Sequence, residues 1–135
     1  MHFGKFSVST QAQMQFVDIT AQAEQVANER GITDGILYLF NPHTTAGLTV
    51  NEGYDPDVQH DLLGVFQKVI PTSSSYPYRH AEGNSPSHIL ATLTGSSLTV
   101  ILVDDKLQLG TWQRIFFCEY DGPRNRHIMW KIIVG

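Results

Sequence analysis

Three of the six histidines lie beside small polar residues, in segments that resemble loops or strand edges. They are His43 in NPHTTAG, His80 in YRHAEGN and His88 in SPSHI. Neutral imidazole is the commonest ligand of divalent metals, and three imidazoles with an open fourth position are typical of catalytic zinc sites. The eight-residue interval between His80 and His88 matches no short metal-binding motif, so solvated or hydrogen-bonding histidines remain the alternative. The remaining histidines are interpreted as surface or strand residues: His2, His60 and His127.

Polar groups that a phosphate or a metal-bound water would use lie close to these histidines in the sequence. Thr44 and Thr45 carry hydroxyls that can donate to phosphate oxygens. Glu52 is a candidate general base, or a carboxylate that orients an imidazole, and Asn84 has an amide suited to positioning a substrate. The alternatives are an ordinary Ser/Thr turn and a solvated loop carboxylate.

The segment GTWQ places an indole and an amide at the start of an expected strand. Trp112 is interpreted first as a core or subunit-contact anchor and second as a ring that stacks on a substrate. Gln113 is a candidate hydrogen-bond partner for a heterocycle. The single cysteine, Cys118, lies in a strand pattern without a neighbouring histidine, which favours a small buried residue over a nucleophile. Nucleotide-binding and serine-hydrolase motifs are absent.

Length and composition favour a single domain over residues 1–135, with 41% apolar residues to form one core. The net charge of −4 and the lack of a Lys/Arg run argue against nucleic acid as a partner. No stretch reaches the roughly 18 apolar residues that a membrane span needs, so we expect a cytoplasmic protein. Charged residues make up only 16% of the chain, which hints that a partner subunit covers part of the surface.

The first half of the chain predicts two short strands around Phe3–Val8 and Met14–Phe16, arranged as a hairpin. A helix is expected from Thr20 to the glycine at position 31, because apolar residues recur at helical spacing. The run from Gly35 to Phe40 is continuously apolar and predicts a strand buried on both faces. A further strand is expected over 48–50.

A second helix is expected to follow Asp55, whose position suits an N-cap, and to end at Pro71. Its predicted apolar stripe consists of Val58, Leu62, Val65, Phe66 and Val69. Residues 71–87 form a long polar loop in which function is expected. Four strands are predicted after it, over 89–93, 98–103, 112–119 and 126–134. The expected fold class is α+β, with largely antiparallel sheets and two main helices.

Four phrases and the terminal strand, in this order, resemble the YjbQ-like family over nearly the whole chain: HTTAGLTVNE, DPDVQHDL, YRHAEGNSPSHI and LGTWQRIFFCEYDGPR. The resemblance implies a compact α+β fold that assembles as a homotrimer. It also implies a metal ion, often zinc, at His43, His80 and His88, with magnesium as the alternative for phosphate substrates. Ser87 stands where the family usually has alanine, which leaves the ligand but changes its surroundings.

The activity that the resemblance implies is a secondary thiamine-phosphate synthase reaction, which couples a pyrimidine diphosphate to a thiazole phosphate. The partner would then be a small phosphorylated metabolite. Arg79, in the basic flank of His80, is a candidate phosphate contact. Two alternatives stay open: a metal-dependent hydrolase of a small phosphate or amide, and a metal- or metabolite-binding trimer without turnover.

Overall fold

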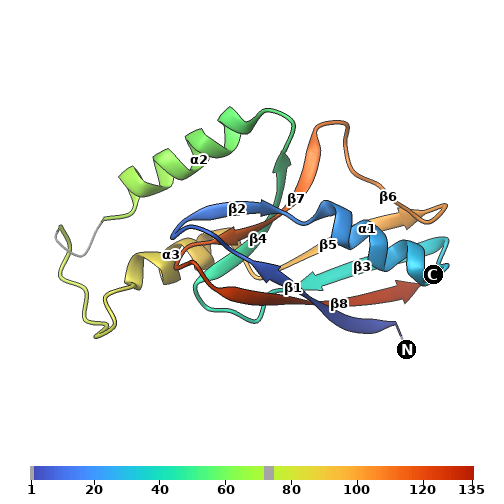
Figure 1. The fold of residues 1–135 in the computed structure, drawn as a ribbon, viewed down its shortest axis with the longest axis horizontal. Helices are drawn as coiled ribbons and strands as arrows, with labels where there is room; N and C mark the ends of the chain where they lie inside the picture. Colours follow the sequence, from blue (N-terminus) through green and yellow to red (C-terminus); the bar gives the residue numbers. More distant parts are fainter. Residues whose placement is uncertain (1, 72–74) are drawn as a thin grey trace.

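The computed structural model describes residues 2–71 and 75–135 and has three helices and eight strands within them (Figure 1). The helices are α1 (Thr20–Glu29), α2 (Pro56–Val69) and α3 (Ser85–Thr94). The strands are β1 (Phe3–Ser9), β2 (Gln15–Asp18), β3 (Asp34–Phe40), β4 (Ala46–Glu52), β5 (Ser97–Val103), β6 (Lys106–Leu107), β7 (Gln113–Glu119) and β8 (Asn125–Val134). The expected α+β class is confirmed.

The strands form two antiparallel sheets. The larger sheet has the order β1-β8-β3-β5-β6 and the smaller one has the order β2-β7-β4. The main core lies between the sheets and α1, where alternate strand residues such as Leu37, Val100, Phe117 and Ile128 are buried. A second cluster packs the opposite face of β7 against α3 and the neighbouring part of α2. Strand β7 is therefore covered on both faces.

The expected hairpin at the start of the chain is wrong. Strand β1 pairs with β8 in the larger sheet, whereas β2 pairs with β7 in the smaller one. The polar residues between them form a crossing between sheets rather than a tight turn. Alternation of apolar residues predicts a strand but not the strand with which it pairs, because pairing depends on segments far away in the sequence.

The strand expected over 89–93 is also wrong, because residues 85–94 form helix α3. Pro86 lies in the first turn, where a missing N–H costs nothing. Ser87, Leu90 and Ala91 are buried, and their spacing of three and four residues defines one helical face. A short apolar run does not distinguish a strand from a buried helix by periodicity alone. The expectation of two main helices is thereby corrected to three within residues 2–71 and 75–135.

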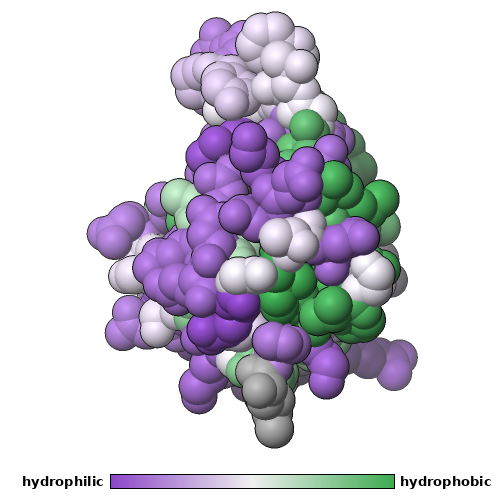
Figure 2. Space-filling model, turned by 90° about the vertical axis from the view of Figure 1, so that its right-hand side faces the viewer, coloured by the Kyte–Doolittle hydropathy of each residue, from purple (hydrophilic) through white to green (hydrophobic). Residues whose placement is uncertain are grey.

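Strand β3 is buried on one face only, which corrects the expectation of burial on both. Leu37 and Leu39 are buried, whereas Ile36, Tyr38 and Phe40 are more than a third exposed. Together with exposed apolar residues of the other strands of the larger sheet, they form what we call the outer sheet face. It consists of Phe3, Ile36, Tyr38, Phe40, Ile101, Val103 and Ile133. Figure 2 shows apolar side chains gathered along one side of the molecule.

Helix α2 begins as expected, with the Asp55 carboxylate accepting a hydrogen bond from the backbone N–H of Asp57. Its apolar stripe is not buried: none of the residues of α2, all of which the structure describes, is buried, and Val65 and Val69 are exposed. Phe66 meets the ring of Tyr120 edge to face. Among the described residues, no helix is long and apolar enough to cross a membrane.

Candidate functional site

The loop between β3 and β4 carries His43, and a buried asparagine organises it. The Asn41 side-chain oxygen accepts from the backbone N–H of His43 at 2.9 Å. Its amide nitrogen donates to the carbonyls of His43 and Ala46, at 3.2 and 2.7 Å. The Asn41 side chain thus bonds backbone groups that have no partner strand in the loop. These bonds hold His43 at the end of the larger sheet.

The His43 ring contacts the backbone of β8 at His127. Its Nε2 lies 3.0 Å from the His127 nitrogen and 3.1 Å from the His127 carbonyl oxygen. Burial, followed by the positive charge of Arg126, lowers the pKa of His43 below its ordinary value. His43 is therefore disposed to stay neutral, the form that accepts a proton or binds a cation.

His80 and His88 come together from different elements. His88 is in the first half of α3, and His80 precedes that helix in the polar loop. Their ring centroids are 5.3 Å apart and the rings meet edge to face. The Glu82 carboxylate lies 3.9 Å from His80 Nε2 at the surface. The helix and the loop thus present two imidazoles as a pair.

All three histidines line one cavity of about 410 Å³. The cavity also exposes hydroxyl, carboxylate, amide and guanidinium groups; its lining comprises Pro42, His43, Thr44, Thr45, His80, Glu82, Asn84, His88, Asp121, Arg124 and Arg126. A second hollow of about 530 Å³ shares His43 and His88 and reaches Phe40 on the outer sheet face. The site is therefore a polar cavity next to an apolar surface.

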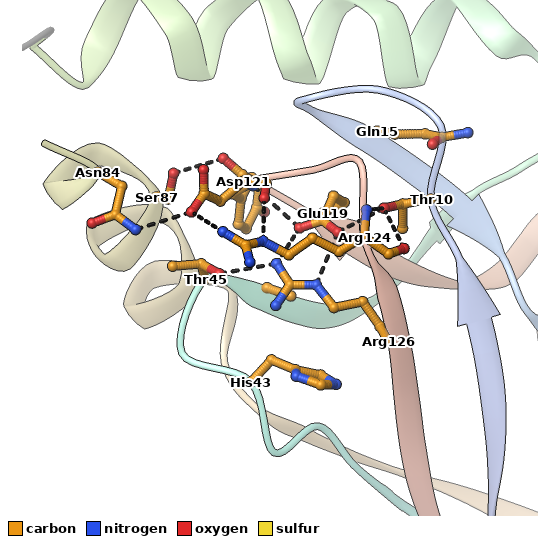
Figure 3. A network of polar contacts seen from close by, with 12 residues as sticks. Thr10, Gln15, His43, Thr45, Asn84, Ser87, Glu119, Asp121, Arg124 and Arg126 are labelled. Atoms are coloured by element: carbon orange, nitrogen blue, oxygen red, sulfur yellow. Dashed lines mark hydrogen bonds and ion pairs between the residues drawn. The ribbon is translucent and has the colours of Figure 1, made fainter. Parts of the chain in front are cut away.

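Arg126, which lines this cavity, belongs to a buried ion pair with Glu119 (Figure 3). Arg126 on β8 bonds both carboxylate oxygens of Glu119 on β7, and Glu119 is 0% exposed. Thr10 donates to the same carboxylate at 2.8 Å, and Arg126 donates to Thr45 at 2.9 Å. Burial by itself raises the pKa of Glu119, but the bonds from Arg126 and Thr10 lower that pKa overall. This pair joins β8 of the larger sheet to β7 of the smaller one.

A second ion pair lies at the rim. Arg124 donates to the carbonyl and the carboxylate of Asp121, at 2.7 and 3.1 Å. The Asn84 amide donates to the same carboxylate at 2.9 Å, which anchors the start of α3 (Figure 3). The side-chain oxygen of Asn84 is buried and has no hydrogen-bond partner among the described residues.

The donor chemistry of the cavity fits a divalent ion. A metal-bound histidine usually donates its other ring N–H to a carbonyl or a carboxylate, and His43 Nε2 lies in reach of the His127 carbonyl. In the tautomer in which Nε2 donates to that carbonyl, Nδ1 is left to bind a metal; in the other tautomer Nε2 accepts from the His127 N–H and Nδ1 carries the proton. His80 and His88 are the neighbouring donors. In the part of the chain that the structure describes, no three His, Cys, Asp or Glu side chains form a compact metal-binding group. The three-histidine site stays a prediction.

Four of the expected site residues lie elsewhere: Glu52, Arg79, Trp112 and Gln113. Glu52 pairs with Gln113 at one end of the β4–β7 ladder, whereas Ala46 pairs with Glu119 at the other. Six steps of strand at about 3.4 Å each separate these ends by about 20 Å. The Glu52 carboxylate accepts from the backbone N–H of Tyr54 at 2.6 Å, and so stabilises the turn before α2.

Trp112 is 62% exposed and meets Tyr54 edge to face. The Gln113 side chain accepts from the Gly110 backbone and closes a turn. Arg79 is exposed and does not line the cavity that holds His80. Cys118 is fully buried, and burial raises the pKa of its thiol to about 12, which agrees with a packing role. The structure thus brings together the histidines, Thr44, Thr45 and Asn84 but not these residues.

Sequence reasoning missed four charged residues of the site: Glu119, Asp121, Arg124 and Arg126. A signal for two of them was present. Arg126 is in phase with Ile128 and Trp130 on the buried face of β8, and Glu119 interrupts an apolar run. A charge that occupies a core position of a strand requires a buried partner.

Comparisons with known proteins agree with this architecture. The model of the family described as "UPF0047 protein YjbQ-like" matches residues 4–135. The UPF0047 protein MJ1081 of Methanocaldococcus jannaschii is 44% identical over 129 residues, which cover 96% of this chain and 92% of that protein. The UPF0047 protein YugU of Bacillus subtilis is also 44% identical, over 88% of this chain and 89% of its own.

Solved structures give the same result. An uncharacterised YjbQ/UPF0047 protein from Clostridium acetobutylicum superimposes with a TM-score of 0.91 at 48% identity, covering 96% of this chain and 98% of that one. The hypothetical protein APE1520 of Aeropyrum pernix has a TM-score of 0.92 at 33% identity over the full length of both chains. Fold and site define an α+β protein with a histidine- and arginine-lined cavity at the junction of two antiparallel sheets. The chain belongs to the YjbQ-like UPF0047 family.

Proposed function

We propose that this protein is a metal-dependent enzyme of small phosphorylated metabolites, with a secondary thiamine-phosphate synthase activity. The observation that supports it is the cavity lined by His43, His80 and His88 together with hydroxyl and guanidinium donors. Cation ligands and phosphate donors in one space suit a reaction in which a diphosphate departs.

In that reaction the thiazole nitrogen attacks the methylene carbon of the pyrimidine diphosphate. The bond from that carbon to the diphosphate oxygen breaks, and pyrophosphate leaves with the electron pair. A divalent ion, zinc in particular, would be held by His43, His80 and His88 and would supply positive charge against the departing phosphates. Magnesium is the alternative because it commonly accompanies phosphate substrates.

The chain's own residues would divide the remaining work. Thr44 is exposed at the cavity wall and free to donate to a phosphate oxygen, whereas Thr45 is buried and supports Arg126. Asn84 has an unpartnered acceptor oxygen beside the cavity, which suits positioning an amine. Glu52 has no part in this proposal because it lies at the far end of the β4–β7 ladder.

A second function, metal-assisted hydrolysis of a small phosphate or amide, is favoured by the same open arrangement of imidazoles. A metal- or metabolite-binding homotrimer without turnover is the third. The outer sheet face supports assembly because it leaves several large apolar side chains exposed.

The experiment is turnover by metal-loaded protein supplied with the pyrimidine diphosphate and the thiazole phosphate. Thiamine phosphate and pyrophosphate should form slowly, and His80→Ala should abolish their formation. His60→Ala is the matched control, because His60 is an exposed histidine of α2 outside the cavity. Release of inorganic phosphate without thiamine phosphate would favour the hydrolase. Metal binding without any product would favour the binding protein.

A further inference from the structure

Two arginines that line the cavity, Arg124 and Arg126, were not among the site residues predicted from the sequence. Arg124 and Arg126 flank the beginning of β8, and both line the cavity with the three histidines. Figure 3 shows both side chains within one network that also holds Glu119 and Asp121. Two guanidinium groups in a cavity of this size are a concentrated source of N–H donors.

Each guanidinium has donors left over. An arginine carries five N–H groups. Arg126 uses Nε and both hydrogens of Nη2 on Glu119 and Thr45, so the two N–H groups of Nη1 remain. Arg124 uses Nε and one hydrogen of Nη2 on Asp121, so three remain. Among the residues that the structure describes, neither Nη1 has a hydrogen-bond partner.

Both side chains are fixed before any ligand arrives. Arg126 is 7% exposed and is held from two sides by Glu119 and Thr45. Arg124 is more exposed but is held by Asp121, which Asn84 bonds in turn. A planar fork that is already immobilised loses little conformational freedom on binding, which favours affinity.

We infer that Arg124 and Arg126 form the subsite for the phosphate or diphosphate group of the substrate. The inference rests on the proposed function, whose substrate class it narrows. Guanidinium N–H pairs match the spacing of phosphate oxygens, and a phosphate group has enough oxygens to accept from two arginines at once. Thr44 adds a hydroxyl in the same cavity.

The charge balance specifies how this subsite works. Each arginine is already paired with a carboxylate, so the cavity offers directed donors rather than a large positive potential. A divalent ion at the histidines would supply the missing charge. Binding of a phosphate group should therefore be measurable without the ion and tighter with it.

This assignment replaces Arg79 as the phosphate contact. Arg79 is exposed and does not line the cavity with His43, so its charge would act only at a distance. Salt screens such exposed charges beyond about 8 Å at physiological ionic strength. Arg79 is thus the matched control, since Arg79→Gln removes the same charge from a neighbouring surface.

The test is calorimetric titration of the full-length protein with inorganic pyrophosphate, with and without zinc. Arg124→Gln should weaken binding by about tenfold to a hundredfold, the usual effect of losing charge-assisted bonds. Arg126→Lys keeps the charge beside Glu119 but loses the fork, and should also weaken binding at least about tenfold. Arg79→Gln should bind like the unmodified protein. Acetate should bind more weakly than pyrophosphate.

The outcomes separate this subsite from the proposed activity. Weaker pyrophosphate binding in both cavity variants, with zinc content unchanged, supports the subsite even if no thiamine phosphate is ever formed. Unchanged binding in Arg124→Gln, or an equal loss in Arg79→Gln, overturns it even if the enzyme turns over. Acetate binding as tight as pyrophosphate binding overturns the phosphate class. Circular dichroism confirms that each variant is folded.

Discussion

The His43 ring occupies the place on β8 where β3 would continue, with its Nε2 3.0 Å from the His127 nitrogen and 3.1 Å from the His127 oxygen. Strand β3 stops pairing at Phe40, opposite Met129. Because Nε2 of a neutral imidazole either donates or accepts, the ring satisfies one of these two backbone groups, according to its tautomer. The same contact fixes the ring orientation in the cavity.

The stability of the metal-free protein should fall as pH is lowered through the histidine range. The folded state holds the pKa of His43 below its ordinary value of 6.5, so the unfolded chain binds the proton more readily. The contribution is complete above about pH 6.5 and is lost as pH falls from there toward the folded pKa. Urea unfolding at pH 7.5 and 5.5 measures it, and His43→Gln should flatten the dependence. An equal slope in His43→Gln would contradict this origin.

Glu119→Gln should destabilise the protein by about 3 to 5 kcal/mol, because it leaves Arg126 as an unpaired buried charge. Asp18→Asn is the matched control. Its pair with Arg114 is about a third exposed, and solvent screening limits such a pair to about 1 kcal/mol. Chemical denaturation of both variants compares them directly. Equal losses of unfolding free energy in the two variants would show that burial gives the Glu119–Arg126 pair no extra contribution to stability.

Removal of one imidazole of the adjacent pair should release bound zinc. His88→Ala is expected to lower metal content at least about tenfold without unfolding α3, because the buried face of that helix consists of Ser87, Leu90 and Ala91. Elemental analysis of protein purified without a histidine tag measures the stoichiometry. The control variant His60→Ala should retain the metal. If His88→Ala keeps its full zinc content, His88 is not a ligand of the ion.

The outer sheet face should mediate assembly. Ile101→Lys puts a charge on a side chain that is 59% exposed in the single chain, and should reduce the assembled mass toward 15.1 kDa. The reason is the cost of burying an unpaired ammonium in an apolar interface. Val69→Lys on α2 is the control for an exposed apolar residue elsewhere. Light scattering distinguishes them, and dissociation only in the α2 variant would place the interface there.

Several elements could be predicted from local chemistry. Asp55 before Pro56 specified the start of α2, and the alternation of β8 was evident from Ile128 to Ile132. The polar loop after β3 made His43 a candidate site residue, and His43 lines the cavity, whereas its role as a metal ligand stays a prediction. These predictions succeeded because capping and strand alternation depend on neighbours in sequence.

Other features depend on contacts across long sequence separations. Glu119 and Arg126 form a pair only because β7 and β8 belong to different sheets that meet there. Glu52 was placed near the histidines by sequence distance, although strand β4 carries it to the opposite end of the ladder. Helix α3 was misassigned because its apolar residues alone do not distinguish a helix from a strand.

Helix α2 has no buried residue, and this should affect how long an ion stays bound in the cavity. A helix without a buried side chain opens at a small fraction of the global unfolding free energy, so its amides should exchange with solvent early. His80 follows this helix in the chain, whereas His88 belongs to a helix anchored by Ser87 on the Tyr120 carbonyl. One imidazole of the pair thus follows a helix without a buried side chain, and the other belongs to a helix whose Ser87 side chain is bonded to the Tyr120 carbonyl. The residence time of a bound ion would then depend on the rate at which α2 opens locally as well as on the strength of the bonds from the histidines to the ion.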